Sequence, residues 1–394
     1  MTGRRLLHLG FAFPPGLSAL HPAINPAGHN FESRMIAALR AHFDIRSAGM
    51  LPFPISGFPA NADPASGIAH DLLLVDQAPE LWHRMQALRE LKKNYLRWQN
   101  EKWIPDAILV YNLAPVYNQF IRWLRRQPQR PRLVLLLLDS AQLGSSIPAW
   151  TRFRYKFKPF VTLDEDMLDE YDACIGLSPG VEKHTAAHQL PMLWMPGACS
   201  PNPPPPVDVR VDDTGPVRFC NFGALAAHAG ALELTRAFLQ TPGTSELHIS
   251  GYGRHSGELA ELAKSSARIH FHGLLPKPEE CLRLGQSCDV LVNPRPPGFG
   301  NENNMPSKLF DYALCARAIL TSRHSGAEAV LGPEAFYFET DDYVTNLRRA
   351  LERAAGMERV ELHRRGASIC ERVKREFNWP RQAERMAEFI FKLT

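Results

Sequence analysis

One stretch, residues 287–325, constrains the fold of this chain more than any other. It opens with a short buried-strand pattern, Asp289 to Val292, of the kind found in parallel sheets covered on both faces. A loop rich in Pro, Gly and Asn follows, and Pro306 then suits the first position of a helix. A second apolar run, Ala318 to Thr321, predicts another buried strand. Strand, loop, helix and strand in this order predict a parallel α/β sheet, and such sheets bind ligands at the carboxyl ends of their strands.

The start of the predicted helix carries the residue types of a phosphate site. Free N–H groups and the positive end of the helix dipole at Pro306-Ser307-Lys308 suit a phosphate or diphosphate, and Lys308 adds a formal positive charge. Asp311 lies one turn later, where we expect it to accept hydrogen bonds from ribose hydroxyls, because an anion would repel it. A capped surface helix with a Lys308–Asp311 pair explains the same residues. The pattern alone leaves both interpretations open.

The same stretch resembles the donor site of retaining GT-B glycosyltransferases of the family-four type. Residues 306–312, Pro-Ser-Lys-Leu-Phe-Asp-Tyr, are similar to the helix start P-S-K-[LF]-[FL]-E-Y of that family. In this resemblance Asp311 replaces the second Glu of an E-x7-E motif, which the family uses to hold the ribose. Asn303 stands at the position of the first Glu, and Glu302 precedes it. The resemblance therefore implies that Glu302 or Asn303 contacts the transferred sugar.

Further segments of the second half match the family in the expected order. Gly251 and Gly253 resemble its G-x-G turn after a strand, and residues 268–275 resemble its F-x-G segment, where backbone groups around Leu274 would edge the base. Phe377-Asn378-Trp379 resembles its F-[SN]-W ending. The match covers residues 217–394 well and residues 1–200 in outline.

The loop after the predicted strand Val217 to Phe222 departs from the family. Resembled enzymes place Arg and Lys there to clamp the donor diphosphate, whereas this chain has Gly223, several alanines and His228, which is only partly charged near neutral pH. We expect Arg254, Arg295 or Lys308 to supply the missing positive charge.

In the first half, two positions are candidates for the site. Gly28 precedes a predicted helix, at the place where the resembled family has a glycine-rich loop across the cleft, although a single glycine there favours an ordinary turn. Asp139 follows the predicted strand Val134 to Leu138 and either hydrogen-bonds the incoming acceptor hydroxyl or caps the next segment. Asp164-Glu165-Asp166 is interpreted as an acidic helix start rather than a metal motif. His270 and His272 alternate along a strand without a third ligand near them, so we expect no metal site.

The expected fold class is α/β, of the GT-B type, with two Rossmann-like parallel-sheet domains facing a cleft. Residues 1–200 would form the acceptor-side domain, 201–216 a Pro-rich linker, and 217–374 the nucleotide-sugar-binding domain. Residues 375–394 would form a C-terminal helix that crosses back to the first domain. A chain of 394 residues is long enough for two hydrophobic cores.

Composition limits the partners and the cellular compartment that we expect for the protein. A net charge of +4 is too small for a nucleic-acid-coating protein, so no nucleic-acid partner is expected. Seven cysteines without a C-x-x-C pair favour reduced thiols in a cytoplasmic protein. No apolar window approaches the ~20 residues of a membrane span. Basic residues between 84 and 158 alternate with aromatic ones, which fits either solvated charge around a core or peripheral contact with the inner face of a membrane.

The expected function is transfer of a hexosyl or deoxyhexosyl group, with retention, from a nucleotide diphosphate sugar to a hydroxyl of a glycan or lipid-linked precursor, as in polysaccharide biosynthesis. Neither a cofactor nor an obligatory metal is expected. Lys308, with Arg254 or Arg295, would stabilise the departing diphosphate. Two alternatives stay open: a GT-B binding partner without catalysis, suggested by the alanine-rich loop and the missing Glu, and a nucleotide-sugar epimerase or phosphorylase on the same fold.

Overall fold

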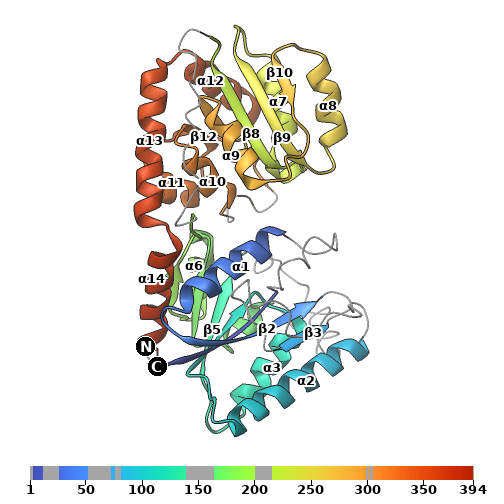
Figure 1. The fold of residues 1–394 in the computed structure, drawn as a ribbon, viewed down its shortest axis with the longest axis vertical. Helices are drawn as coiled ribbons and strands as arrows, with labels where there is room; N and C mark the ends of the chain where they lie inside the picture. Colours follow the sequence, from blue (N-terminus) through green and yellow to red (C-terminus); the bar gives the residue numbers. More distant parts are fainter. Residues whose placement is uncertain are drawn as a thin grey trace. The chain divides into compact units, whose positions relative to one another are not determined.

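The structure is a computed structural model that describes residues 3–11, 26–51, 72–75, 81–138, 164–199, 215–298, 301 and 305–393. The chain divides into two compact units, and each is described by itself. The first unit contains Met1–Gly197 and Trp379–Thr394, and the second contains Ala198–Asn378. Each unit is a parallel β-sheet with helices, and Figure 1 labels most of these elements.

The first unit is built on a seven-stranded sheet in the order β3-β2-β1-β4-β5-β6-β7. All of its strand pairs in the described residues are parallel, because each strand is followed by a crossover back to the amino end of the sheet. The strands are β1 Arg5–Gly10, β2 Asp44–Leu51, β3 Leu72–Val75, β4 Ala107–Tyr111, β5 Arg132–Leu137, β6 Ala173–Gly176 and β7 Met192–Trp194.

Helices of the first unit cover its sheet with apolar side chains. Tyr95 and Trp98 of α2 and Phe120 of α3 join the core formed by alternate residues of the central strands. The C-terminal helix α14 packs along α1, where the rings of Phe31 and Trp379 meet edge to face at 5.2 Å. The helices are α1 Pro26–Leu39, α2 Leu81–Asn100, α3 Pro115–Arg125, α5 Asp164–Leu168, α6 Glu182–Ala187 and α14 Trp379–Phe391.

The second unit is built on a six-stranded parallel sheet in the order β10-β9-β8-β11-β12-β13. From β8 the chain moves outward through β9 and β10, and it then returns to pair β11 on the other side of β8. The direction of strand order therefore reverses between β8 and β11, which is the place where open parallel sheets bind ligands. The strands are β8 Arg218–Ala224, β9 Glu246–Tyr252, β10 Ile269–Phe271, β11 Val290–Asn293, β12 Ala318–Ser322 and β13 Phe336–Phe338.

Helices of the second unit lie on both faces of its sheet, as expected where strands are apolar on both sides. Phe219, Leu247 and Val292 pack against α7 and α12 in one core. On the alternate positions, Gly285 of α9 lies so close to Phe222 and Leu291 that an added Cβ would crowd them. The helices are α7 Ala231–Leu239, α8 Ser256–Lys264, α9 Pro278–Gln286, α10 Lys308–Leu314, α11 Ser325–Leu331, α12 Tyr343–Ala355 and α13 Arg359–Glu376.

The predicted α/β class with two Rossmann-like parallel sheets is confirmed, but two local expectations were wrong. Gly28 is the third residue of α1 rather than a loop residue, because the helix already begins at Pro26, a residue suited to a first turn. The helix expected from Pro306 begins at Lys308, because the preceding turn closes with a tighter bond from Leu309 N–H to Pro306 O. Asp139, Glu302, Asn303 and most of the linker lie outside the described residues.

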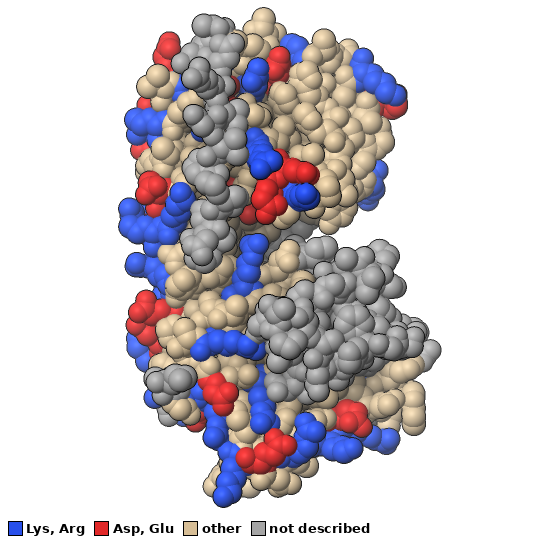
Figure 2. All heavy atoms as spheres, viewed as in Figure 1, with Lys and Arg blue, Asp and Glu red and all other residues tan. Residues whose placement is uncertain are grey.

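Two features bear on the environment of the protein. No helix in the described part of the chain is both long and apolar enough to cross a membrane. Around α2, the expected basic face is interspersed with acidic side chains, as Figure 2 shows for the lower part of the viewed face. Arg97 pairs with Glu101, which also accepts a hydrogen bond from Arg46 at 2.9 Å. Residues 139–163 of the basic stretch lie outside the described residues, and both interpretations stay open.

Candidate functional site

Lysine, arginine and histidine residues from separate parts of the sequence meet at the carboxyl edge of the second sheet. The segment after β8 carries His228, the one after β9 carries Arg254, and the one after β11 carries Arg295. His324 follows β12, and Lys308 begins α10. The pKa of His228 is lowered by burial and by the charges of Arg295, Lys308 and Arg254, so these four residues lie within electrostatic reach of one another. The structure thus brings together all three residues that were expected to replace the missing basic clamp.

Lys308 is the most unusual member of this group. Part of its side chain is exposed, but its Nζ atom is buried and has no hydrogen-bond partner among the described residues. Nζ lies 5.6 Å from the centre of the Tyr312 ring. Burial, followed by the charge of Arg295, lowers the pKa of Lys308 to about 7. A buried ammonium group without a carboxylate partner is costly, and such groups concentrate at functional sites.

The position of Lys308 is fixed by Tyr312, one turn later on α10. The buried Tyr312 hydroxyl donates to the carbonyl of Phe222 at 3.0 Å and accepts from the N–H of the same residue at 3.0 Å. It therefore ties α10 to the end of β8. Next to it, Gly223 adopts a φ of +125°, and the nearest atom to an added Cβ would be Lys308 Cδ at 3.7 Å. Gly223 and Lys308 therefore lie side by side.

Arg295 is held by a buried amide that links two loops. Its Nη1 donates to Asn301 Oδ1 at 3.0 Å, and Asn301 Nδ2 donates to the carbonyls of His228 at 3.0 Å and Pro296 at 2.8 Å. The loop after β11 is thereby fastened to the loop after β8, at the point where the strand order reverses. Sequence reasoning missed Asn301, although it directly precedes Glu302 and Asn303.

His324 is a second residue that sequence reasoning missed. Its Nδ1 accepts the N–H of Ala327 at 3.2 Å and caps α11, so the proton of the neutral ring is on Nε2. Nε2 is buried and lacks a hydrogen-bond partner in the described part of the chain. Burial and the charge of Arg295 lower the pKa of His324 to about 4, which keeps the ring neutral and leaves Nε2–H as a donor.

The two glycines of the G-x-G turn are required by close backbone contacts. A Cβ on Gly251 would lie 1.8 Å from the carbonyl oxygen of Gly223, and one on Gly253 would lie 2.4 Å from that of Leu225. Both glycines have positive φ, near 150°. The N–H of Gly251 donates to Gly273 O at 2.8 Å, which places the segment leading to the exposed Leu274 beside this turn. In this structure the two glycines serve loop packing.

The remaining predicted residues are placed less tightly. Pro306 is buried, and Ser307 is the exposed N-cap of α10 with helical torsions and no capping bond from its side chain. Asp311 is exposed in the first turn of α10. Burial raises the pKa of the Cys281 and Cys315 thiols, and the charge of Asp311 adds to this shift. Arg254 is exposed, with its Nε 3.3 Å from His255 Nε2, at the rim of the group. Gly28 belongs to the first unit.

Comparisons with known proteins identify the fold of this chain. Neither a protein-family model nor a curated protein matches the sequence. Solved structures do match over nearly the full length. The lipopolysaccharide outer core galactosyltransferase WaaB shares 13% identity with a TM-score of 0.65, covering 99% of this chain and 100% of that one. Sucrose-phosphate synthase from Thermosynechococcus elongatus shares 16% identity with a TM-score of 0.69, covering 99% of each.

The chain has the GT-B fold. A third structure of this fold, Anabaena HepE in complex with UDP and glucose, shares 13% identity with a TM-score of 0.64 and covers 99% of this chain and 100% of that one. At such identity the likeness concerns the fold. In this chain, Lys308, Arg295 and His324 meet at the carboxyl edge of the second sheet of that fold.

Proposed function

We propose that this protein is a glycosyltransferase that moves a sugar from a nucleoside diphosphate sugar to a hydroxyl acceptor with retention. One observation carries the proposal: the buried Lys308 ammonium has no hydrogen-bond partner among the described residues, and Arg295 is close enough to depress its pKa. Two neighbouring cations destabilise a buried site unless an anion binds between or beside them. A diphosphate supplies that anion.

The chemistry of the group suits a departing diphosphate. Lys308 and Arg295 offer charge, His324 offers an N–H donor, and Arg254 adds charge at the rim. Donors fixed by the surrounding fold stabilise charge that develops on a leaving group without reorganising. Lys308 is fixed through α10 and Tyr312, and Arg295 through Asn301. Uridine nucleotides are the first choice of donor, since a GT-B structure similar to this one was determined with UDP and glucose.

The other roles belong to the same proposal. Asp311 would hold the ribose, and backbone groups at Leu274 would edge the base. Glu302 or Asn303 would contact the transferred sugar, and Asp139 would contact the acceptor hydroxyl. We further propose a hexosyl or deoxyhexosyl donor and an acceptor on a glycan or a lipid-linked precursor. Contact with a membrane through the basic side of α2 stays a prediction.

Binding and turnover test the proposal separately. Calorimetric titration with UDP, GDP, ADP and dTDP should identify one diphosphate that binds, and the matching sugar nucleotides should then be turned over. Lys308→Ala and Asp311→Ala should each reduce transfer more than tenfold with folding intact. The matched control is Lys264→Ala, whose side chain is exposed on α8. Near-normal rates in the first two variants would reject the site.

The alternatives predict different products. A GT-B binding partner without catalysis would bind none of the nucleoside diphosphates and would transfer no sugar. An epimerase or phosphorylase would yield its product without a hydroxyl acceptor. The alanine-rich loop that suggested an inactive protein is flanked in the structure by Lys308 and Arg295, which supports the active enzyme.

A further inference from the structure

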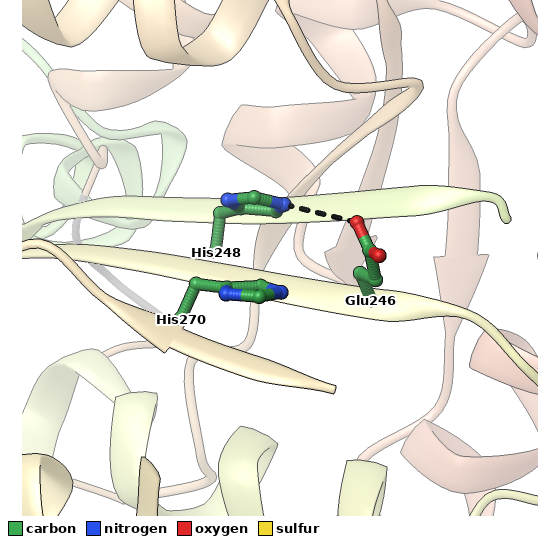
Figure 3. A group of neighbouring side chains, drawn as sticks. All are labelled: Glu246, His248 and His270. Atoms are coloured by element: carbon green, nitrogen blue, oxygen red, sulfur yellow. Dashed lines mark ion pairs between the residues drawn. The ribbon is translucent and has the colours of Figure 1, made fainter. Parts of the chain in front are cut away.

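Three side chains with metal-binding atoms lie together on the outer strands of the second sheet. Glu246 and His248 are two residues apart on β9 and thus point to the same face. His270 of β10 stands directly opposite His248 in the parallel register. One ligand atom of each residue lies within 4.8 Å of those of the other two, as Figure 3 shows. The expectation that no third ligand lies near the histidines was wrong, because strand pairing supplies Glu246 and His248 from a distant part of the sequence.

The hydrogen bonds of His248 involve its Nδ1 atom and leave its Nε2 atom without a hydrogen-bond partner in the described residues. Its Nδ1 lies 3.1 Å from His272 Nε2, so these two nitrogens share a hydrogen bond. Its Nε2 lies 3.6 Å from Glu246 Oε2, which is too long for a hydrogen bond. His248 Nε2 and His270 Nε2 are both buried and without a hydrogen-bond partner in the described residues. Two ring nitrogens that lack a hydrogen-bond partner in the described residues thus converge with a carboxylate oxygen.

The surroundings keep these groups ready to bind a cation. A neutral imidazole is the form of histidine that coordinates metals. Arg218 Nε donates to Glu246 Oε2 at 3.3 Å and so orients the carboxylate. Orienting partners of this kind, like His272 behind His248, accompany the ligands of natural metal sites.

We propose that Glu246, His248 and His270 form a binding site for a divalent transition-metal ion, with Zn²⁺ as the expected occupant. Two imidazoles and one carboxylate, completed by water, match the donor set that Zn²⁺ accepts. Bonds of about 2.0 to 2.2 Å in a tetrahedral site place the ligand atoms about 3.4 Å apart. The present separations lie within 4.8 Å, and the ligand atoms would move closer together on binding the ion.

The site is structural and separate from the candidate donor site. Glu246 is the first residue of β9, whereas Gly251 is near its carboxyl end, about 16 Å further along at about 3.3 Å per residue. A metal ion at this place would join the edge strand β10 to β9. The inference does not depend on the proposed glycosyltransferase activity.

The test is metal binding by the tag-free, chelator-treated protein. Titration with zinc chloride in a calorimeter should show one equivalent bound, and Co²⁺ should give the visible absorption of a four-coordinate site. Zn²⁺ should raise the Tm. His248→Ala, His270→Ala and Glu246→Gln should each weaken Zn²⁺ binding at least tenfold and remove the shift in Tm. The matched control is His188→Ala, which removes another histidine paired with a carboxylate, at 2.7 Å from Asp169, in the first unit.

Two results would overturn the proposal. One is wild-type protein that binds no Zn²⁺ at micromolar concentration. The other is Zn²⁺ binding that is equally tight in the wild type and in folded Glu246→Gln, which would assign the ion to other groups. Glu246→Gln preserves the volume of the side chain and an acceptor for Arg218, so it provides a folded variant even where the alanine variants unfold.

Discussion

Replacing Lys308 with methionine should stabilise the ligand-free protein, which is the reverse of the usual effect of a core substitution. The pKa of Lys308 falls from its usual 10.5 to about 7, chiefly because the ammonium is buried. At about 1.4 kcal/mol per pH unit, this difference corresponds to at most about 5 kcal/mol of lost stability. Relaxation around the charge reduces the cost, so we expect Lys308→Met to gain about 2 to 3 kcal/mol at pH 6.

The dependence on pH has a defined sign. Below pH 7 both the folded and the unfolded chain carry the proton on Lys308, and the full cost of the buried charge is present. Between about 7 and 10.5 only the unfolded state stays protonated, so the free energy of unfolding rises with pH in this window. Above it the cost disappears. The advantage of Lys308→Met should therefore be largest at pH 6 and smaller at pH 9.

Urea denaturation followed by far-UV circular dichroism measures this effect at both pH values. Lys264→Met is the matched control, since that side chain is 71% exposed and only pairs with Glu261. Its stability should change by less than about 0.5 kcal/mol. If Lys308→Met were less stable than the wild type at pH 6, the ammonium would be a satisfied structural group, and the reasoning that leads to an anion site would be refuted.

Three further predictions follow from the same structure. Binding of UDP at pH 8 should be accompanied by the uptake of close to one proton, because a bound diphosphate restores the charge of Lys308. Calorimetry in buffers of different ionisation enthalpy measures the number of protons taken up, and a value of zero would contradict the prediction. Gly251→Ala should cost at least about 3 kcal/mol in thermal or urea unfolding, because its Cβ would collide with Gly223 O, whereas Gly257→Ala, with open space around it, should be neutral or slightly stabilising. Glu32→Ala should cost about 3 kcal/mol by the same measurement, since the buried carboxylate accepts the N–H of Phe11 and lies 3.2 Å from His8 Nε2; an unchanged midpoint would show that the pair is dispensable.

The parts of the fold that local patterns describe were predicted well. The apolar run Ala318 to Thr321 became β12, which extends one residue further, and the run Asp289 to Val292 became β11, which is shifted by one residue. Element boundaries depend on the last hydrogen bonds, as at Pro306 and Gly28, and were less certain. The segment Pro306 to Tyr312 indicates an anion site because it contains Lys308. The hydrogen bonds from Tyr312 to β8 cannot be predicted from that segment, because they join distant residues.

By itself, the sequence determined the alternation of apolar strands and amphipathic helices, and it marked the start of α10 as a place for an anion. Only the tertiary structure decided that Arg295 and His324 lie beside Lys308, and that Glu246 and His248 meet His270. The physical reason is that helices and strands form from contacts between near neighbours in the chain. Which side chains are neighbours at a strand end depends instead on strand order and register, because these bring together residues that are far apart in the sequence.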